Sequence, residues 1–307
     1  MKHLVSIRDL SRQDALSLLS SAQELSQVNE RSIKKLPTLR GRTVVNLFYE
    51  NSTRTRISFE IAAKRLSADV INVSADSSSV AKGESLKDTA QTLEALGADC
   101  IVLRHPSSGA AHQLANFGWI NSSVINAGDG THEHPTQALL DALTIQQKLG
   151  EDLSEMKVLI VGDIRHSRVA RSNAILLGML GARVEFAGPD SLVPIELKNL
   201  AASISNDFDV SIANKPDVVM MLRVQRERML ENFKDSQREY INQWSLSRER
   251  LQKLAKRTLI MHPGPINRGL EISPEAAEDP RSVILQQVKN GLAARMAVLH
   301  RLLSEEQ

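Results

Sequence analysis

Along most of the chain, short runs of consecutive apolar residues alternate with stretches in which apolar residues recur every three or four positions. Unbroken apolar runs are typical of strands buried on both faces, and the three-to-four spacing is typical of helices that cover a sheet. The pattern therefore predicts an α/β fold built on doubly wound parallel sheets. The expected strands are residues 43–49, 69–74, 100–105, 123–128, 157–163, 183–188, 217–223 and 257–265.

Polar residues mark where several helices should begin. Ser11, with Asp14 three residues later, predicts a capping box, and Ser85 with Asp88 predicts a second cap. Pro135 suits the first turn of a helix that bridges the two halves of the chain. A last amphipathic helix is expected from apolar residues spaced by three or four positions, namely Ile284, Val288, Leu292, Met296, Leu299 and Leu303.

The length of the chain, 307 residues, is too great for one ordinary domain and suits two. We expect a first domain at residues 1–149 and a second domain of similar size at residues 150–283, joined by bridging helices. The final helix, residues 284–305, is expected to pack its apolar stripe back on the first domain.

Composition narrows the classes of function. Aromatic residues make up only 3% of the chain, too few for base-stacking platforms, and the net charge of +2 gives no general attraction to nucleic acid or anionic lipid. The single cysteine, Cys100, excludes an intramolecular disulfide and suits a reducing compartment. No apolar run approaches the length of a membrane span or a signal peptide, so we expect a cytoplasmic protein without nucleic-acid or membrane partners.

The first candidate site follows the strand at residues 43–49. Ser52, Thr53, Arg54 and Thr55 crowd hydroxyl and cationic donors at the expected start of a helix, where free backbone N–H groups also point. The alternative is an ordinary serine cap followed by a solvated basic turn. The density of donors favours a phosphate site made without glycine. No G-x-x-x-x-G-K-[ST] motif is present, so phosphoryl transfer through that loop is unsupported.

Further candidates follow other strands of the first half. Arg104 ends one strand, His134 and Gln137 stand at a helix start, and Lys82 lies in a serine-rich loop. Strand ends of one parallel sheet converge, so these side chains are expected near the phosphate site. His132 and His134 make a weak case for a metal pair because no third ligand is near, and a neutral imidazole donating to a carbonyl oxygen fits His134 better.

The second half offers arginines at strand ends. The segment VLIVGDIRHSR has the strand and glycine of a nucleotide-binding start but lacks G-x-G-x-x-G. Arg168 and Arg223 each follow an apolar strand, and paired guanidinium groups suit carboxylates. Arg226 and Arg228 are interpreted as solvated helix surface. The sequence thus predicts a phosphate-type site in the first half and a carboxylate-type site in the second.

Seven segments together resemble one known family. They are NSTRTRISFE, SVAKGES, VLRHP, GDGTHEHPTQALLD, GDIRHSRVARSN, MLRVQRER and MHPGPINRGLEI, and they occur in this order along the chain. In these segments the chain is similar to the catalytic chains of bacterial aspartate transcarbamoylases, also called aspartate carbamoyltransferases. The S-T-R-T-R and H-P-T-Q motifs are typical of carbamoyltransferases in general, and the other segments select aspartate.

The resemblance implies which residues bind each substrate. The phosphate of carbamoyl phosphate would be bound by Ser52, Thr53, Arg54, Thr55 and Arg104. The carbamoyl group would be contacted by Thr55, His134 and Gln137, and the backbone of Gly264 and Pro265 would line the site. The carboxylates of L-aspartate would be bound by Lys82, Arg168, Arg223 and Gln225.

The implied reaction gives N-carbamoyl-L-aspartate and phosphate, the committed step of de novo pyrimidine biosynthesis. Thr55, Arg104 and His134 would stabilise the charge that develops on the former carbonyl oxygen, while Arg54 and Lys82 offset the charge of the departing phosphate. No metal or organic cofactor is required. The sequence does not identify the group that accepts the proton of the aspartate amine, and the substrate phosphate is one candidate.

The resemblance also concerns assembly. Family members are homotrimers with shared active sites, so Lys82, with Ser78 or Ser79, is expected to reach the site of a neighbouring subunit. Whether the trimer pairs with a regulatory chain, a dihydroorotase-like partner or neither stays open. Allosteric control is not inferred, because the enterobacterial form has a leucine where this chain has Gly264.

Two alternatives accompany this interpretation. Ornithine transcarbamoylases share the phosphate motif, but they use an H-C-L-P segment where this chain has HPGP, and arginines in the second half would repel the side chain of ornithine. A catalytically silent homologue acting as a scaffold or binding nucleic acid is the other alternative. The intact Ser52, Arg54, Lys82, Arg104 and His134 argue against it.

Overall fold

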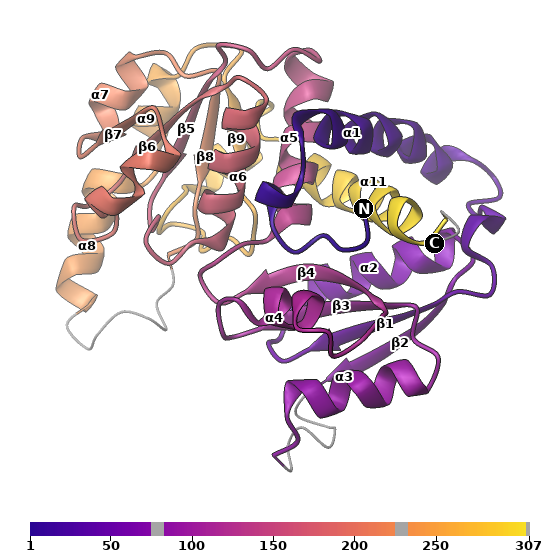
Figure 1. The fold of residues 1–307 in the computed structure, drawn as a ribbon. Coiled ribbons are helices and arrows are strands. Elements are labelled where there is room, and N and C mark those ends of the chain that lie inside the picture. Colours follow the sequence, from indigo (N-terminus) through magenta and orange to yellow (C-terminus); the bar gives the residue numbers. More distant parts are fainter. Residues whose placement is uncertain (75–82, 225–232, 305–307) are drawn as a thin grey trace. The chain divides into compact units, whose positions relative to one another are not determined.

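A computed structural model describes residues 1–74, 83–224 and 233–304 of the chain. The chain forms two compact units, one made of Met1–Leu143 and Lys289–Gln307 and the other of Thr144–Val288. Each unit is built on its own parallel sheet (Figure 1). The predicted α/β fold with two parallel-sheet domains is therefore confirmed.

The first unit has a four-stranded sheet in the order β2-β1-β3-β4, and all neighbouring strands are parallel. Since every strand runs in the same direction, the four carboxyl ends lie at one edge of the sheet. The strands are β1 (Thr43–Phe48), β2 (Asp69–Ser74), β3 (Cys100–His105) and β4 (Ser123–Asp129).

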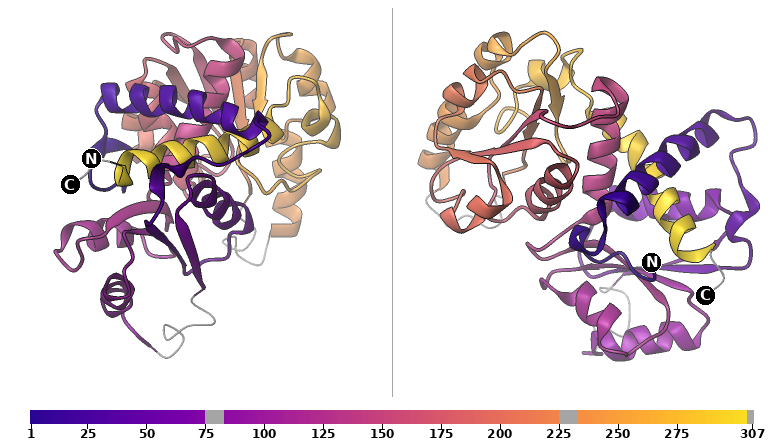
Figure 2. Two further views of the ribbon diagram at one scale, coloured as in Figure 1. Left: turned by 90° about the vertical axis from the view of Figure 1, so that its right-hand side faces the viewer. Right: turned by 45° about the horizontal axis from the view of Figure 1, so that its top comes forward.

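Helices cover both faces of this sheet. α1, α2 and α11 lie on one face, and α3 and α4 lie on the other (Figures 1 and 2). On the second face, Leu47 and Ile101 from the strands pack with Leu114 of α4 in one buried cluster. The helices are α1 (Arg12–Ser26), α2 (Thr53–Arg65), α3 (Leu86–Ala95), α4 (Ala110–Asn116), α5 (Pro135–Leu149) and α11 (Ile284–Leu303), with short 3-10 helices at Ile7–Asp9, Gln27–Glu30 and Pro37–Leu39.

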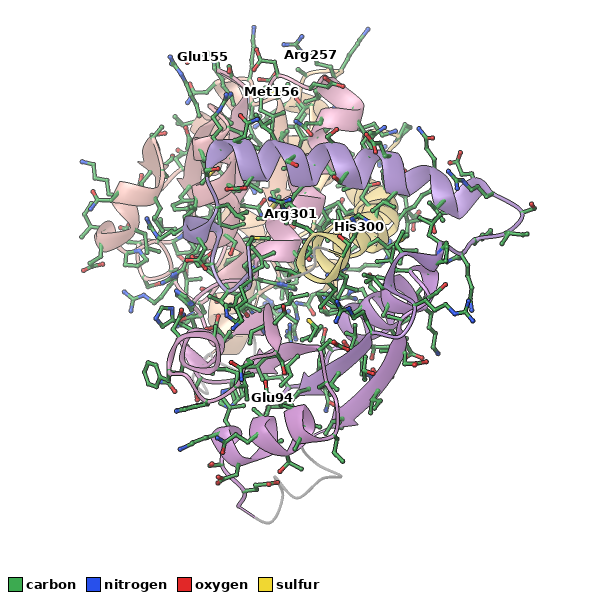
Figure 3. All side chains as sticks on the ribbon, turned by 45° about the vertical axis from the view of Figure 1, so that its right-hand side comes forward. Glu94, Glu155, Met156, Arg257, His300 and Arg301 are labelled. Atoms are coloured by element: carbon green, nitrogen blue, oxygen red, sulfur yellow. The ribbon has the colours of Figure 1, made fainter. Side chains whose placement is uncertain are left out.

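The predicted caps of α1 and α3 are present. Ser11 Oγ accepts the backbone N–H of Asp14 at 3.1 Å, and the Asp14 carboxylate accepts the N–H of Ser11 at 3.1 Å, which completes a capping box. Ser85 Oγ accepts the N–H of Asp88 at 3.2 Å. Glu94, near the end of α3 (Figure 3), accepts at 2.7 Å from the N–H just before β4 and so ties the helix to the sheet.

The buried face of α11 differs from the predicted stripe at its start. Met296 and Leu299 are fully buried, and the last turn carries the basic residues His300 and Arg301 (Figure 3), which suit the negative end of the helix dipole. Val288, however, is 53% exposed. Gln287 is buried in its place, because its side-chain oxygen accepts a backbone hydrogen bond from the segment after β9.

The second unit has a five-stranded parallel sheet in the order β7-β6-β5-β8-β9. Val161 and Met221 of its central strands pack with Trp244 in the core. The strands are β5 (Lys157–Val161), β6 (Arg183–Ala187), β7 (Ser203–Ser205), β8 (Val218–Met221) and β9 (Leu259–Met261). The helices are α6 (Arg168–Met179), α7 (Phe208–Ala213), α8 (Phe233–Trp244), α9 (Arg248–Lys253), α10 (Pro274–Glu278) and the 3-10 helix Ile195–Leu200.

None of the helices in the described part of the chain combines the length and apolar character that crossing a membrane requires.

Candidate active site

The carboxyl edge of the four-stranded sheet gathers the first set of predicted residues. β1, β3 and β4 are neighbours, so the segments that follow them leave the sheet side by side. Thr53, Arg54 and Thr55 lie in the first turn of α2 just after β1, Arg104 lies in β3, and His134 and Gln137 lie at the start of α5 after β4. Ligands of open parallel sheets bind at this edge.

The first turn of α2 concentrates positive charge where a helix disfavours it. Arg54 and Arg56 lie there, and the turn has no acidic residue, so the positive end of the helix dipole is reinforced. Ser52 occupies the N-cap position but makes no side-chain cap hydrogen bond, unlike Ser11 and Ser85. An ordinary serine cap therefore does not describe this helix start, and an anion would offset its charge.

Arg104 is held at the sheet edge by two contacts. Its Nε lies 3.3 Å from Oε2 of Glu50, and its Nη1 donates to the backbone oxygen of Ala127 at 3.1 Å. The arginine side chain is only 14% exposed and that of Glu50 23%. A partly buried ion pair of this kind fixes the direction of the guanidinium group. Sequence reasoning did not find Glu50, which carries no motif of its own.

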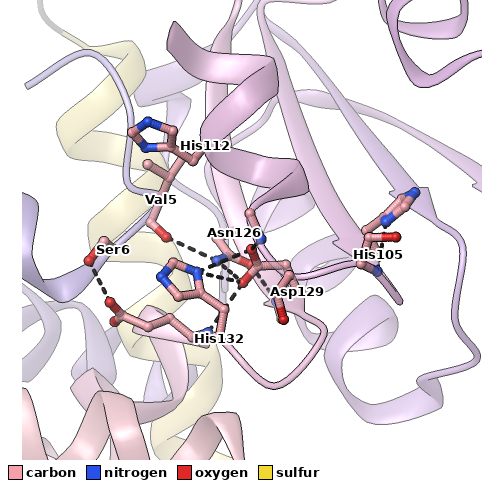
Figure 4. A network of polar contacts seen from close by, with 12 residues as sticks. Val5, Ser6, His105, His112, Asn126, Asp129 and His132 are labelled. Carbon is pink, nitrogen blue, oxygen red and sulfur yellow. Dashed lines mark hydrogen bonds and ion pairs between the residues drawn. The ribbon is translucent and has the colours of Figure 1, made fainter.

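The loop before His134 is organised around the fully buried Asp129 (Figure 4). Its carboxylate accepts from the Asn126 amide at 2.7 Å and from the Gly109 N–H at 2.7 Å, and it lies 3.2 Å from Nδ1 of His132. Burial raises the pKa of Asp129, but the contacts with His132 and Asn126 outweigh it and leave the pKa lowered. Asp129 is therefore held as a carboxylate that ties this loop to the segment after β3.

The N-terminal segment secures the same loop through Glu133. Its carboxylate accepts the N–H of Ile7 at 3.0 Å and the hydroxyl of Ser6, and the side chain is 2% exposed. His132 pairs with an acid, and His134, 4% exposed, is buried at the start of α5. The two histidines that could have been read as a metal pair thus differ in their surroundings.

Gln137 lies in the first turn of α5 and is 8% exposed. Its Nε2 donates to Oδ1 of Asp141 at 3.0 Å, and Asp141 is fully buried. The side-chain amide of Gln137 is therefore fixed by a carboxylate one helical turn further on. Asp141 was not identified from the sequence, where it reads as one polar position in an apolar helix.

The carboxyl edge of the five-stranded sheet carries the second set. Arg168 is the first residue of α6 after β5, and Ser167 caps that helix by accepting the N–H of Ala170 at 3.1 Å. Arg223 follows β8 by two residues. Because β5 and β8 are neighbours, both arginines belong to segments at the same edge of the sheet. Both are partly exposed.

The segment after β9 completes this edge with Gly264 and Pro265, which are joined by a cis peptide bond. Behind it lies a buried pair: Nε2 of His262 is 3.2 Å from Oε1 of Glu271, and both side chains are fully buried. The Glu271 carboxylate also accepts from the side chain of Asn267 at 3.1 Å, and that amide donates to the backbone oxygen of Val224 at 3.2 Å. Glu271 therefore connects the glycine-proline segment to the residue next to Arg223.

Four predicted site residues lie outside the described part of the chain, namely Ser78, Ser79, Lys82 and Gln225. The residues that sequence reasoning missed are polar groups behind the predicted ones, namely the partly buried Glu50 and the buried Asp129, Glu133, Asp141, His262 and Glu271. Their signal in the sequence is weak, because a single acid near a motif is common and only the fold shows that it is buried.

Comparison with known families matches both halves of the chain to one family. The carbamoyl-P binding domain of aspartate/ornithine carbamoyltransferases matches residues 2–147, and the Asp/Orn binding domain of the same family matches residues 154–302. Together the two matches cover nearly all of the chain. The chain belongs to the aspartate/ornithine carbamoyltransferase family, which confirms the resemblance seen in the sequence.

Individual relatives narrow the match further than the family models do. The aspartate carbamoyltransferase catalytic subunit of Micrococcus luteus is 58% identical, with 100% of this chain and 99% of that protein covered. Aspartate transcarbamoylase from Trypanosoma cruzi, solved with N-(phosphonacetyl)-L-aspartic acid, has a TM-score of 0.89 at 31% identity, with 98% of this chain and 96% of that one covered. Ornithine carbamoyltransferase from Pyrococcus furiosus has a TM-score of 0.90 at 26% identity, with 100% and 98% covered. The fold alone therefore does not separate aspartate from ornithine.

Proposed function

We propose that this chain transfers the carbamoyl group of carbamoyl phosphate to the α-amine of L-aspartate. The products are N-carbamoyl-L-aspartate and phosphate, and the reaction is the committed step of de novo pyrimidine biosynthesis. Membership of the family and the high identity to relatives named as aspartate carbamoyltransferase catalytic subunits support this function.

The observation that carries the choice of aspartate is the pair of arginines at neighbouring strand ends of the second unit. Arg168 follows β5 and Arg223 follows β8. Guanidinium groups present a planar fork of donors that matches a carboxylate, so two of them suit a dicarboxylic amino acid. The same charges would repel the cationic side chain of ornithine. An ornithine carbamoyltransferase shares the fold but needs the opposite charge in its amino-acid site.

In the first unit, the phosphate of carbamoyl phosphate is assigned to the start of α2 and to Arg104. The donors are the side chains of Ser52, Thr53, Arg54 and Thr55 with backbone N–H groups of the first turn. Gln137 and His134 are assigned to the carbamoyl group, and Gly264 and Pro265 to backbone contacts along the site. Lys82 and Gln225 are assigned to aspartate from the resemblance.

The reaction needs charge stabilisation rather than a covalent intermediate. The amine of aspartate attacks the carbonyl carbon, and negative charge develops on the former carbonyl oxygen. Thr55, Arg104 and His134 stabilise that oxygen as fixed donors, and because Arg104 is already oriented by Glu50, little reorganisation is needed. Arg54 and Lys82 offset the charge of phosphate as it leaves. Holding both substrates in line supplies a further part of the acceleration.

The assembly proposed from the resemblance is a cytoplasmic homotrimer. Lys82, with Ser78 or Ser79, then contributes to the site of a neighbouring subunit. Mixing two inactive variants tests this arrangement: Lys82→Ala and Arg54→Ala subunits, combined after dissociation, regain activity only if one trimer can form a site from two different chains.

The function is tested by phosphate release from carbamoyl phosphate with L-aspartate, with L-ornithine and with no acceptor, using the purified chain without added metal. Release that depends on aspartate and yields carbamoyl aspartate supports the proposal. Release that depends on ornithine would overturn the assignment of Arg168 and Arg223. No release with either acceptor would favour a catalytically silent homologue.

A further inference from the structure

The side-chain amide of Gln137 has a defined orientation. Its nitrogen lies 3.0 Å from Oδ1 of Asp141, and the two residues are 8% and 0% exposed. A carboxylate can only accept hydrogen bonds, so the amide group that faces it must be the NH₂. The amide oxygen of Gln137 therefore points away from Asp141.

Arg295 of α11 interacts electrostatically with Asp141. The guanidinium group of Arg295 is buried, and burial lowers its pKa while the charge of Asp141 raises it, which leaves the pKa at about 10. Arg295 thus stays charged at neutral pH, and a buried cation needs a neighbouring anion. Asp141 supplies that charge within the same unit of the fold.

Arg295 is itself fixed from two further directions. Its Nη1 donates to the hydroxyl of Ser58 at 2.9 Å, and its guanidinium carbon lies 5.1 Å from the ring centre of Phe59, both on α2. The helix that carries the proposed phosphate site is therefore linked through Arg295 and Asp141 to the amide of Gln137. All of these contacts lie inside the first unit.

α11 has room for this arginine because residue 291 is a glycine. A Cβ atom at Gly291 would lie 2.6 Å from Nη1 of Arg295 and 3.2 Å from Cδ2 of Leu140 on α5. The side chain of Arg295 thus occupies the space next to Gly291, one helical turn earlier on α11.

We propose that Asp141, paired with Arg295, is a positioning residue that turns the amide oxygen of Gln137 towards the carbamoyl group. The site then selects an acyl phosphate that carries an N–H donor over one that carries a methyl group. The inference rests on the proposed function, in which Gln137 contacts the carbamoyl group. A carbamoyl NH₂ can donate to this oxygen, and an acetyl CH₃ cannot. A site that leaves a buried acceptor unpaired discriminates strongly against the ligand that lacks the donor.

The variant Asp141→Asn reverses the orientation without removing a side chain. Arg295 has donors only, so the oxygen of the new amide turns to Arg295 and its NH₂ turns to Gln137. Gln137 must then accept from it, which directs the NH₂ of Gln137 towards the carbamoyl NH₂. Asp141→Glu keeps the carboxylate and is expected to keep the selectivity. Ser58→Ala removes only the hydroxyl contact of Arg295 and is the matched control.

The measurement compares KM for carbamoyl phosphate with the inhibition constant of acetyl phosphate, which differs only in the group that Gln137 would contact. For Asp141→Asn we expect KM for carbamoyl phosphate to rise at least tenfold and the inhibition constant of acetyl phosphate to change less than threefold. Ser58→Ala should leave the ratio of the two constants within threefold of the wild-type value.

Equal weakening of both ligands would show a merely structural role and overturn the inference, as would an unchanged ratio. Wild-type protein that does not carbamoylate aspartate would instead refute the proposed function. If Asp141→Asn does not fold, a neutron structure of the wild type tests the orientation of the Gln137 amide. Deuterons on the Gln137 atom that faces Asp141 are expected, and deuterons on the opposite atom would refute the orientation.

Discussion

Gly264 donates its backbone N–H to Nδ1 of His262 at 2.8 Å. Because Nδ1 is the acceptor, the proton of the neutral ring is on Nε2, which faces the carboxylate of Glu271 at 3.2 Å. One buried imidazole therefore joins the glycine-proline segment to an acid that also holds the residue next to Arg223 through Asn267.

Two amide variants separate the contacts of His262. Asn can reproduce the acceptor at Nδ1, and Gln can reproduce the donor at Nε2. We expect His262→Asn to keep the Gly264 contact and lose the link to Glu271, and His262→Gln to do the reverse. If the Gly264 segment lines the site, His262→Gln lowers kcat/KM for aspartate more than His262→Asn does. Steady-state kinetics with aspartate varied measures the difference, and equal kinetics for the two variants would contradict it.

Arg54→Ala is expected to lower turnover at least tenfold, a loss of about 1.4 kcal/mol or more in transition-state stabilisation. The reason is that a charge-assisted contact to the departing phosphate contributes about 1.5 to 3 kcal/mol. Arg56→Ala is the matched control, because Arg56 lies in the same turn but donates to Ser74 at 3.2 Å. A turnover for Arg54→Ala within tenfold of the parent would remove Arg54 from the phosphate site.

Arg168→Ala and Arg223→Ala are each expected to raise KM for aspartate at least tenfold, while KM for carbamoyl phosphate changes little. Each variant removes one fork of donors from a carboxylate. Arg165→Ala serves as the control, because Arg165 lies in the same connection between β5 and α6 with an exposed side chain. An unchanged dependence of rate on aspartate in both variants would refute the carboxylate role.

Gly291→Ala is expected to destabilise the protein by about 1 to 3 kcal/mol, because the added methyl group overlaps Arg295 and Leu140 in a packed interior.

Gly178→Ala in α6 is expected to have the opposite effect on stability. A Cβ there meets nothing within 4 Å, so the free energy of unfolding should rise by about 0.4 to 1 kcal/mol. Urea unfolding measures the change in the free energy of unfolding for each variant. A Gly291→Ala variant more stable than the wild type would contradict the described packing.

The lowered pKa of Asp129 predicts a dependence of stability on pH. A carboxyl group whose pKa is lower in the folded than in the unfolded protein stabilises the fold above its ordinary value near 3.8, and this contribution is lost as pH falls through the folded value. Asp129→Asn should therefore be less stable than wild type at neutral pH, and the difference should shrink in acid. The free energies of unfolding of the wild type and Asp129→Asn, measured from roughly pH 3 to 7, give this difference. A difference that grows on acidification would contradict the assigned direction.

The sequence allowed the sheets to be predicted because apolar runs such as residues 157–161 and 218–221 have few alternatives to a buried parallel strand. β7, at Ser203–Ser205, was not predicted. It has three residues and a single apolar one, and it forms as an edge strand only because β6 is beside it. Short edge strands are set by their neighbours rather than by their own sequence.

The same distinction applies to the site. Arg54, Arg168 and Arg223 lie in the segments or helix starts that follow apolar strands, so their place at a sheet edge follows from topology. Asp141 and Arg295 are far apart in the chain and each reads as one polar residue in an amphipathic helix. Their pairing depends on how α11 packs, which no local pattern encodes.

The return of α11 to the first unit has a consequence for how the chain folds as it is made. Residues 1–143 lack part of their own unit until residues 289–303 have left the ribosome, whereas the second unit, Thr144–Val288, is continuous. Arg295, the charged neighbour of Asp141, is synthesised only after the whole of the second unit. The second unit can therefore close its core before the first unit has received the helix that completes it.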